Sequence, residues 1–115
     1  MRPAPAGSGI IFRRIDLTGA PEVPAKSEFV TNTLRATTLE RGGAKVFTVE
    51  HILSALFALR IDNCILEMDA PEPPVADGGA LTFSQMILEA GIMELEEQTD
   101  ILTLETSVAV YEDNK

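Results

Sequence analysis

The pair Glu50-His51 offers the clearest chemistry in the sequence, because it sets a carboxylate directly before the only histidine among 115 residues. A glutamate can act as a general base, and a neutral imidazole is a common metal ligand. A catalytic zinc needs three protein ligands, which one histidine and one glutamate do not provide. An acid in the first turn of a helix is also an ordinary stabilising feature, so the pair alone is a weak indication of function.

The residues around the pair predict an amphipathic helix that begins near Thr48, a possible N-cap, and ends at about Leu59. Its large apolar side chains share one face, which we expect to lie on a sheet: Val49, Ile52, Leu53, Leu56 and Leu59. The opposite face carries Glu50 and His51, followed by three small residues, Ser54, Ala55 and Ala58. A solvated face would carry charged side chains beyond the first turn, so we expect a second domain or a second copy of the chain, as in a homodimer, to pack there.

The remaining segments alternate between strands and helices. Strands are predicted for residues 10–16, 28–39 and 62–69, with the middle range holding one or two of them. Gly42-Gly43 predicts a hairpin between residues 34–39 and 44–48. A second helix is predicted for residues 81–90, with Gly91 just beyond its end, and a last strand for residues 101–111. This order predicts an α+β domain of two layers, in which one mostly antiparallel sheet carries two helices on one face.

The charge and the cysteine content exclude several classes of protein. The net charge of −9 argues against a nucleic-acid partner, which would require a basic surface, and against an anionic membrane. No window approaches the ~20 apolar residues of a membrane-spanning helix. Cys64 is the only cysteine, so an intrachain disulfide is excluded and nothing indicates an oxidising compartment. We therefore expect a soluble cytoplasmic protein.

Five blocks of sequence, taken in order, carry a family resemblance. They are Arg2-Pro3-Ala4-Pro5-Ala6, residues 9–17, residues 48–56, Ile61-Asp62-Asn63 and residues 71–78. Together they closely resemble UDP-3-O-acyl-N-acetylglucosamine deacetylase, the zinc hydrolase family of bacterial lipid A synthesis, over nearly the whole chain. The Thr48-Val49-Glu50-His51 block is the most specific of the five.

The resemblance implies roles for individual residues. His51 matches the first-domain ligand of a catalytic Zn²⁺, whose other two ligands, a histidine and an aspartate, come from a second domain in the family. Glu50 matches the general base that activates water against the acetamide of a UDP-linked acylated glucosamine. Ala36, Thr37 and Thr38 match a strand that borders the active site, so they are expected to line the substrate. In the family, the helices pack between two sheets.

The resemblance also implies a division of the chain. Residues 1–98 correspond to an N-terminal deacetylase domain that lacks its first strands, and residues 99–115 to a linker and the opening strand of a missing second domain. We expect such a chain to be an incomplete zinc-dependent amide hydrolase, inactive by itself. The alternative is a truncated, catalytically dead α/β module that acts as a self-associating or binding domain. Zinc content, activity after completion and oligomeric state distinguish the two.

Overall fold

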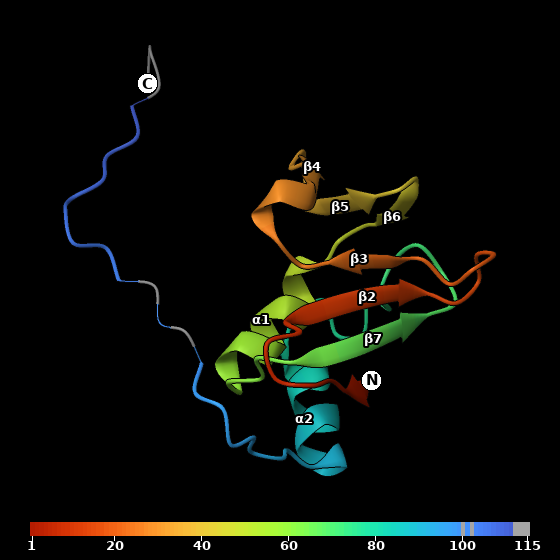
Figure 1. Cartoon of the computed structure of the whole chain (residues 1–115). Coiled ribbons are helices and arrows are strands. Elements are labelled where there is room, and N and C mark those ends of the chain that lie inside the picture. Colours follow the sequence, from red (N-terminus) through yellow and green to blue (C-terminus); the bar gives the residue numbers. More distant parts are fainter. Residues whose placement is uncertain (100, 102, 112–115) are drawn as a thin grey trace.

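The computed structural model describes residues 1–99, 101 and 103–111. In chain order its elements are β1 (Arg2–Pro3), β2 (Ile10–Arg14), β3 (Glu22–Pro24), the 3-10 helix η1 (Ser27–Phe29), β4 (Val30–Asn32), β5 (Thr38–Arg41), β6 (Ala44–Val46), α1 (Glu50–Ala58), β7 (Cys64–Met68) and α2 (Leu81–Ala90). Figure 1 shows both helices behind the sheet that contains β2 and β7. The α+β class with two helices on one side is confirmed.

The strands divide into two sheets, whereas a single sheet was predicted. The larger sheet has the order β1-β7-β2-β3, with β2 and β7 parallel and both outer pairs antiparallel. The smaller sheet, β4-β5-β6, is antiparallel throughout. Pro24 removes a backbone donor at the end of β3, and η1 turns the chain before β4 begins. The parallel pair requires a long crossover, which here includes α1.

The predicted hairpin is present between β5 and β6. Its register pairs Leu39 with Val46 and Arg41 with Ala44. Gly42 and Gly43 occupy the turn with φ values of +57° and +82°. Positive φ at both central residues is typical of the tight turn that suits the twist of two paired strands. The local sequence therefore determined this element.

Helix α1 begins at Glu50, with Val49 as its N-cap, so the prediction that Thr48 caps the helix is wrong. Thr48 has a φ of +53°, in the left-handed region, and no side chain caps the helix. The buried stripe consists of Ile52, Ala55 and Leu56. Ala55, which was predicted to lie on the opposite face, is thus part of the core, while Leu53 and Leu59 are only half-buried.

The core lies between the larger sheet, the β5–β6 hairpin and the two helices. Phe12, Val23, Val46 and Val49 are fully buried and come from β2, β3, β6 and the start of α1. Helix α2 adds Phe83 and Ile87. Gly91 ends α2 with a φ of +87°, and its N–H donates to the carbonyl of Ile87. The predicted position of Gly91 just beyond the helix is confirmed.

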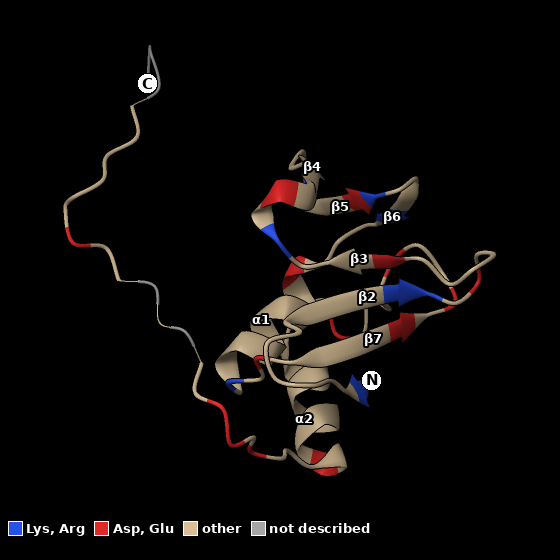
Figure 2. Ribbon diagram, in the orientation of Figure 1, with Lys and Arg blue, Asp and Glu red and all other residues tan. Residues whose placement is uncertain are grey.

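Ion pairs connect the strands of the larger sheet, in which the blue end of β2 lies between red segments of β3 and β7 (Figure 2). The buried Arg14 side chain binds the Asp16 carboxylate at 2.6 and 2.7 Å and also donates to the backbone carbonyl of Lys45. It therefore connects β2 with β6. Arg13 binds Glu22 at 2.6 Å and Glu67 at 3.3 Å, across β3 and β7. These contacts occupy both arginines.

The segment after α2 extends away from the domain (Figure 1). Residues 101 and 103–111, the described part of the predicted last strand, contain no strand. Their sequence alternates, but a strand also needs a partner for its backbone hydrogen bonds, and none of the described strands pairs with these residues. Assignment of residues 99–115 to a second domain stays a prediction. Within the described ranges, no helix is long and apolar enough to cross a membrane.

Candidate active site at the start of helix α1

The backbone before α1 is anchored from two sides. The N–H of Phe47 donates to the carbonyl of Pro71 at 2.8 Å, which fixes the exit from β6 against the proline-rich connection. The N–H of Val49 donates to the carbonyl of Thr37 at 3.4 Å, just before β5. Between these contacts, Thr48 adopts its left-handed conformation. The start of α1 is therefore held in place by residues far from it in sequence.

Glu50 lies in the first turn of α1 and is half-buried. Its Oε2 accepts a hydrogen bond of 3.1 Å from the backbone N–H of Thr37. The first backbone N–H groups of a helix lack partners within the helix and make this end positive. Glu50 is thus an anchored carboxylate with part of its surface accessible, as a general base requires.

His51 follows on the same turn and is also half-buried. A helix turns by ~100° per residue, so the imidazole leaves the helix to one side of the Glu50 carboxylate. Farther along α1, the exposed residues are Ser54, Phe57 and Ala58, and Phe57 is 86 % exposed. Glu50 is the only charged side chain on the helix besides the titratable His51 (Figure 2). The pair therefore borders an uncharged, partly apolar surface.

The three residues predicted to line the substrate lie beside this helix start in different environments. Thr37 contacts Glu50 directly through its backbone and is half-buried, as is Ala36. Thr38 is the first residue of β5 and is 6 % exposed, so it offers little surface to a ligand. The structure brings Thr37 and Glu50 together; the lining role of all three residues stays a prediction.

The donors at this site suit zinc in kind and fall short in number. An imidazole nitrogen is a standard zinc ligand. Among the residues described, no group of three or more histidine, cysteine, aspartate or glutamate side chains could hold a metal ion. His51 could therefore serve as one ligand, and a zinc ion here would need further ligands.

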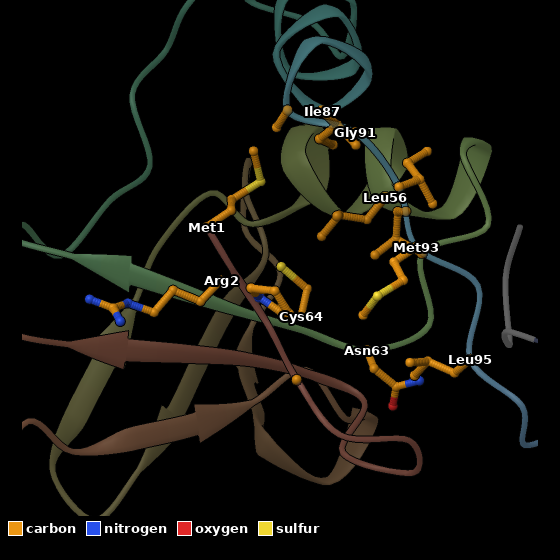
Figure 3. Close-up of a pocket in the computed structure, with 14 residues that line it drawn as sticks. Met1, Arg2, Leu56, Asn63, Cys64, Ile87, Gly91, Met93 and Leu95 are labelled. Atoms are coloured by element: carbon orange, nitrogen blue, oxygen red, sulfur yellow. The ribbon is translucent and has the colours of Figure 1, made fainter.

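An apolar cavity of about 300 Å³ lies away from this pair, near β1, β7 and the ends of both helices (Figure 3). Its lining includes Met1, Leu56, Ile87 and Met93, and neither Glu50 nor His51. Cys64 also lines it, and burial raises the pKa of its thiol, which disfavours the reactive thiolate. We place the candidate site at the helix start because the cavity offers no acid, base or metal ligand of comparable suitability.

The hydrogen bond between Thr37 and Glu50 is the feature of the site that sequence reasoning missed. Thr37 was expected to contact substrate, whereas its backbone N–H contacts the candidate base. The two residues are thirteen positions apart, and the contact depends on how β5 returns beside the start of α1. A backbone donor carries no mark of residue type, so the sequence contains no signal for it.

Comparison with known proteins gives a consistent family match. The sequence model of the family "LpxC: UDP-3-O-acyl N-acetylglycosamine deacetylase" matches residues 1–115. UDP-3-O-acyl-N-acetylglucosamine deacetylases from Myxococcus xanthus (strain DK1622) and Legionella pneumophila (strain Corby) are each 44% identical over 115 residues. That alignment covers 100% of this chain and 37% and 38% of those proteins.

A bifunctional enzyme LpxC/FabZ from Chlorobaculum tepidum is 42% identical over 114 residues, covering 99% of this chain and 24% of that protein. The chain thus spans about two-fifths or less of the length of these curated relatives.

Proposed function

The chain belongs to the UDP-3-O-acyl N-acetylglycosamine deacetylase family, and from this premise we propose that it forms the first part of an enzyme that removes the N-acetyl group from a UDP-linked acylated glucosamine in lipid A synthesis. The observation that carries the proposal is the anchored Glu50 carboxylate next to His51 at the start of α1. A base beside a metal ligand is the combination that metal-assisted amide hydrolysis needs.

We propose that His51 supplies one nitrogen ligand to a catalytic zinc, and that the remaining ligands come from protein outside these 115 residues. The shortage of ligands among the described residues supports this division. When bound, zinc would polarise the acetamide carbonyl as a Lewis acid. The contribution of His51 is a neutral imidazole, held by the first turn of α1.

Glu50 is the general base in this proposal. It accepts the proton that water loses as the water oxygen attacks the acetyl carbon. It then gives that proton to the amide nitrogen as the carbon–nitrogen bond breaks, so that acetate and the free amine of the sugar are released. The Thr37 N–H holds one oxygen of this carboxylate in place before the reaction. The segment of Ala36, Thr37 and Thr38 would then border the bound sugar, because it runs beside Glu50, with buried Thr38 contributing little surface. The substrate class and the unpaired Cys64 support a cytoplasmic location.

The exposed side of α1 is expected to be covered in the complete protein. Phe57 is 86 % exposed, and no charged residue follows Glu50 on the helix. Either the rest of the enzyme or a second copy of the chain would bury this surface. Sedimentation distinguishes the two, because a complete protein that is monomeric excludes the homodimer.

The proposed activity is tested with the complete protein that carries this chain. It should release acetate from UDP-3-O-acyl-N-acetylglucosamine, lose this activity after treatment with a chelator and regain it with added Zn²⁺. As a control for substitutions of Glu50, the variant Glu89→Gln at an exposed position of α2 should leave turnover unchanged. A folded, zinc-supplied complete protein that releases no acetate would contradict the proposal.

A further inference from the structure

We propose that Thr37 is a positioning residue: its backbone N–H holds Oε2 of Glu50, so that Oε1 is the atom that takes the proton. This inference rests on the proposed function, since it assigns an atom to the base of that reaction. It is carried by the hydrogen bond of 3.1 Å between the Thr37 N–H and Oε2 and by the framework around residue 37.

Thr37 holds the start of α1 at two points. Its carbonyl accepts from the N–H of Val49 at 3.4 Å, and its N–H donates to the side chain of Glu50. The backbone of Val49 and the side chain of Glu50 are thus both held by one residue, Thr37. A carboxylate in the first turn of a helix commonly bonds its own helix end, whereas Glu50 reaches across to a segment thirteen residues earlier.

The donor is held by buried structure. Thr37 directly precedes β5, whose first two residues, Thr38 and Leu39, are 6 % and 2 % exposed. Strand β5 pairs with both β4 and β6, so its backbone is fixed on both edges. The β5–β6 hairpin is tied in turn to the larger sheet, because buried Arg14 binds the carbonyl of Lys45. The Thr37 N–H therefore keeps one direction toward the helix start.

The choice of oxygen follows from carboxyl chemistry. Once a carboxylate takes a proton, one oxygen becomes a hydroxyl and the other a carbonyl, and the carbonyl oxygen is the better acceptor. An N–H that already donates to Oε2 favours that oxygen as the carbonyl. Within the described part of the chain, Oε1 receives no hydrogen bond. The proton is therefore directed to Oε1, and the Thr37 N–H keeps its partner in both protonation states.

The decisive experiment removes this N–H in the complete, zinc-supplied protein. Replacing the Thr37 amide by an ester deletes the donor and keeps the side chain; Thr37→Pro deletes it by standard mutagenesis. Loss of a hydrogen bond to a charged group should lower kcat about 10- to 100-fold. KM of the ester variant should stay within about twofold, because the ester keeps the Thr37 side chain that is proposed to border the sugar. The control Thr33→Pro places proline in the same exposed loop, away from Glu50.

A second measurement is independent of activity and of the metal. In a protein labelled with ¹⁵N-threonine, the Thr37 amide proton should be protected from exchange with solvent at constant pH. Glu50→Gln should keep that protection and Glu50→Ala should lose it. Equally fast exchange in the unsubstituted protein and in Glu50→Ala would show that the bond does not form and would overturn the proposal. If Thr37→Pro fails to fold, the ester variant and this exchange measurement decide the matter.

Different experimental results would contradict the positioning role of Thr37 and the proposed function. An ester variant with kcat within about twofold of the unsubstituted protein, beside an inactive Glu50→Gln, would overturn the positioning role alone. So would a raised KM at unchanged kcat, or an ester variant that unfolds, since these indicate substrate binding or a structural role. Absence of acetate release from the unsubstituted protein would contradict the proposed function instead, and the exchange measurement would still report on the bond.

Discussion

At residue 50, glutamate and glutamine can both accept the hydrogen bond from the Thr37 N–H, because either side chain presents an oxygen acceptor. Only the carboxylate can take a proton from water. In the complete protein, Glu50→Gln should therefore lower turnover by about 10²–10⁴-fold, the contribution typical of a general base. Its free energy of unfolding should change by no more than about 0.5 kcal/mol. Acetate release and urea denaturation measure the two effects.

Glu50→Ala serves as the structural counterpart, because it removes the acceptor and leaves the Thr37 N–H without its partner. We expect a loss of about 1 kcal/mol in unfolding free energy, in addition to the loss of turnover. Substantial turnover in either variant would show that another group acts as the base.

The pair Arg14–Asp16 predicts a dependence of stability on acid. Its hydrogen bonds to the Arg14 guanidinium lower the pKa of the Asp16 carboxyl below its ordinary value. The folded state thus keeps Asp16 ionised at a pH where the unfolded chain protonates it. This stabilisation is complete above the unfolded pKa of about 3.9 and is lost as pH falls through the lower folded pKa.

Urea midpoints of the chain should therefore fall as pH is lowered from about 5 to about 3, and the fall should be smaller in Asp16→Asn. Glu67 contributes to the same trend in both proteins, because its hydrogen bond from Arg2 and that from Arg13 lower its pKa. Equal slopes for the two proteins would show that the Arg14–Asp16 pair does not contribute.

Residue types indicated two candidate site residues with distinctive chemistry, and nothing beyond them. Glu50 and His51 stand out because an acid beside a lone histidine is unusual and the flanking blocks are specific, and their roles stay predictions. The Thr37 donor could not, since every residue except proline has an N–H and only the folded chain selects one.

Two adjacent positions on helix α1, one buried and one exposed, provide a matched test of which side of the helix packs on the core. Leu56 is 2 % exposed and lies in the core, whereas Phe57 is 86 % exposed. Leu56→Ala should lower the unfolding free energy of the chain by about 2–5 kcal/mol, because it removes buried methyl groups and leaves a cavity. Phe57→Ala should change it by no more than about 0.5 kcal/mol. Urea denaturation measures both losses of unfolding free energy. Similar losses in the two variants would contradict the buried position of Leu56 and the exposed position of Phe57.

Local patterns predicted the elements that depend on local interactions. The apolar period indicated both helices, and Gly42-Gly43 indicated the β5–β6 turn because glycine readily adopts positive φ. The division into two sheets was missed, since it depends on which distant strands pair and on the turn after Pro24. Alternation in residues 101–111 suggested a strand, but alternation does not supply a pairing partner.

On the scale of the whole molecule, the number of metal ligands decides how zinc should bind. The chain contains one histidine, and its described residues form no cluster of three possible ligands. A site with fewer than three protein ligands holds zinc poorly. The 115-residue chain alone should therefore bind zinc weakly, whereas the complete protein should retain about one zinc ion per chain after dialysis. Calorimetric titration and elemental analysis measure the two cases.

The variant His51→Ala of the complete protein tests whether this chain contributes a ligand to the zinc ion. Removing a direct ligand should weaken zinc binding by more than the about 10–100-fold that loss of an outer-shell partner costs. Gln85→Ala, on the exposed side of α2, should keep the metal content of the unsubstituted protein. Tight one-to-one binding by the chain alone would mean that it holds a complete site. An unchanged zinc content in His51→Ala would show that His51 is not a zinc ligand. The position of Glu50 beside it would then no longer support a metal-assisted reaction.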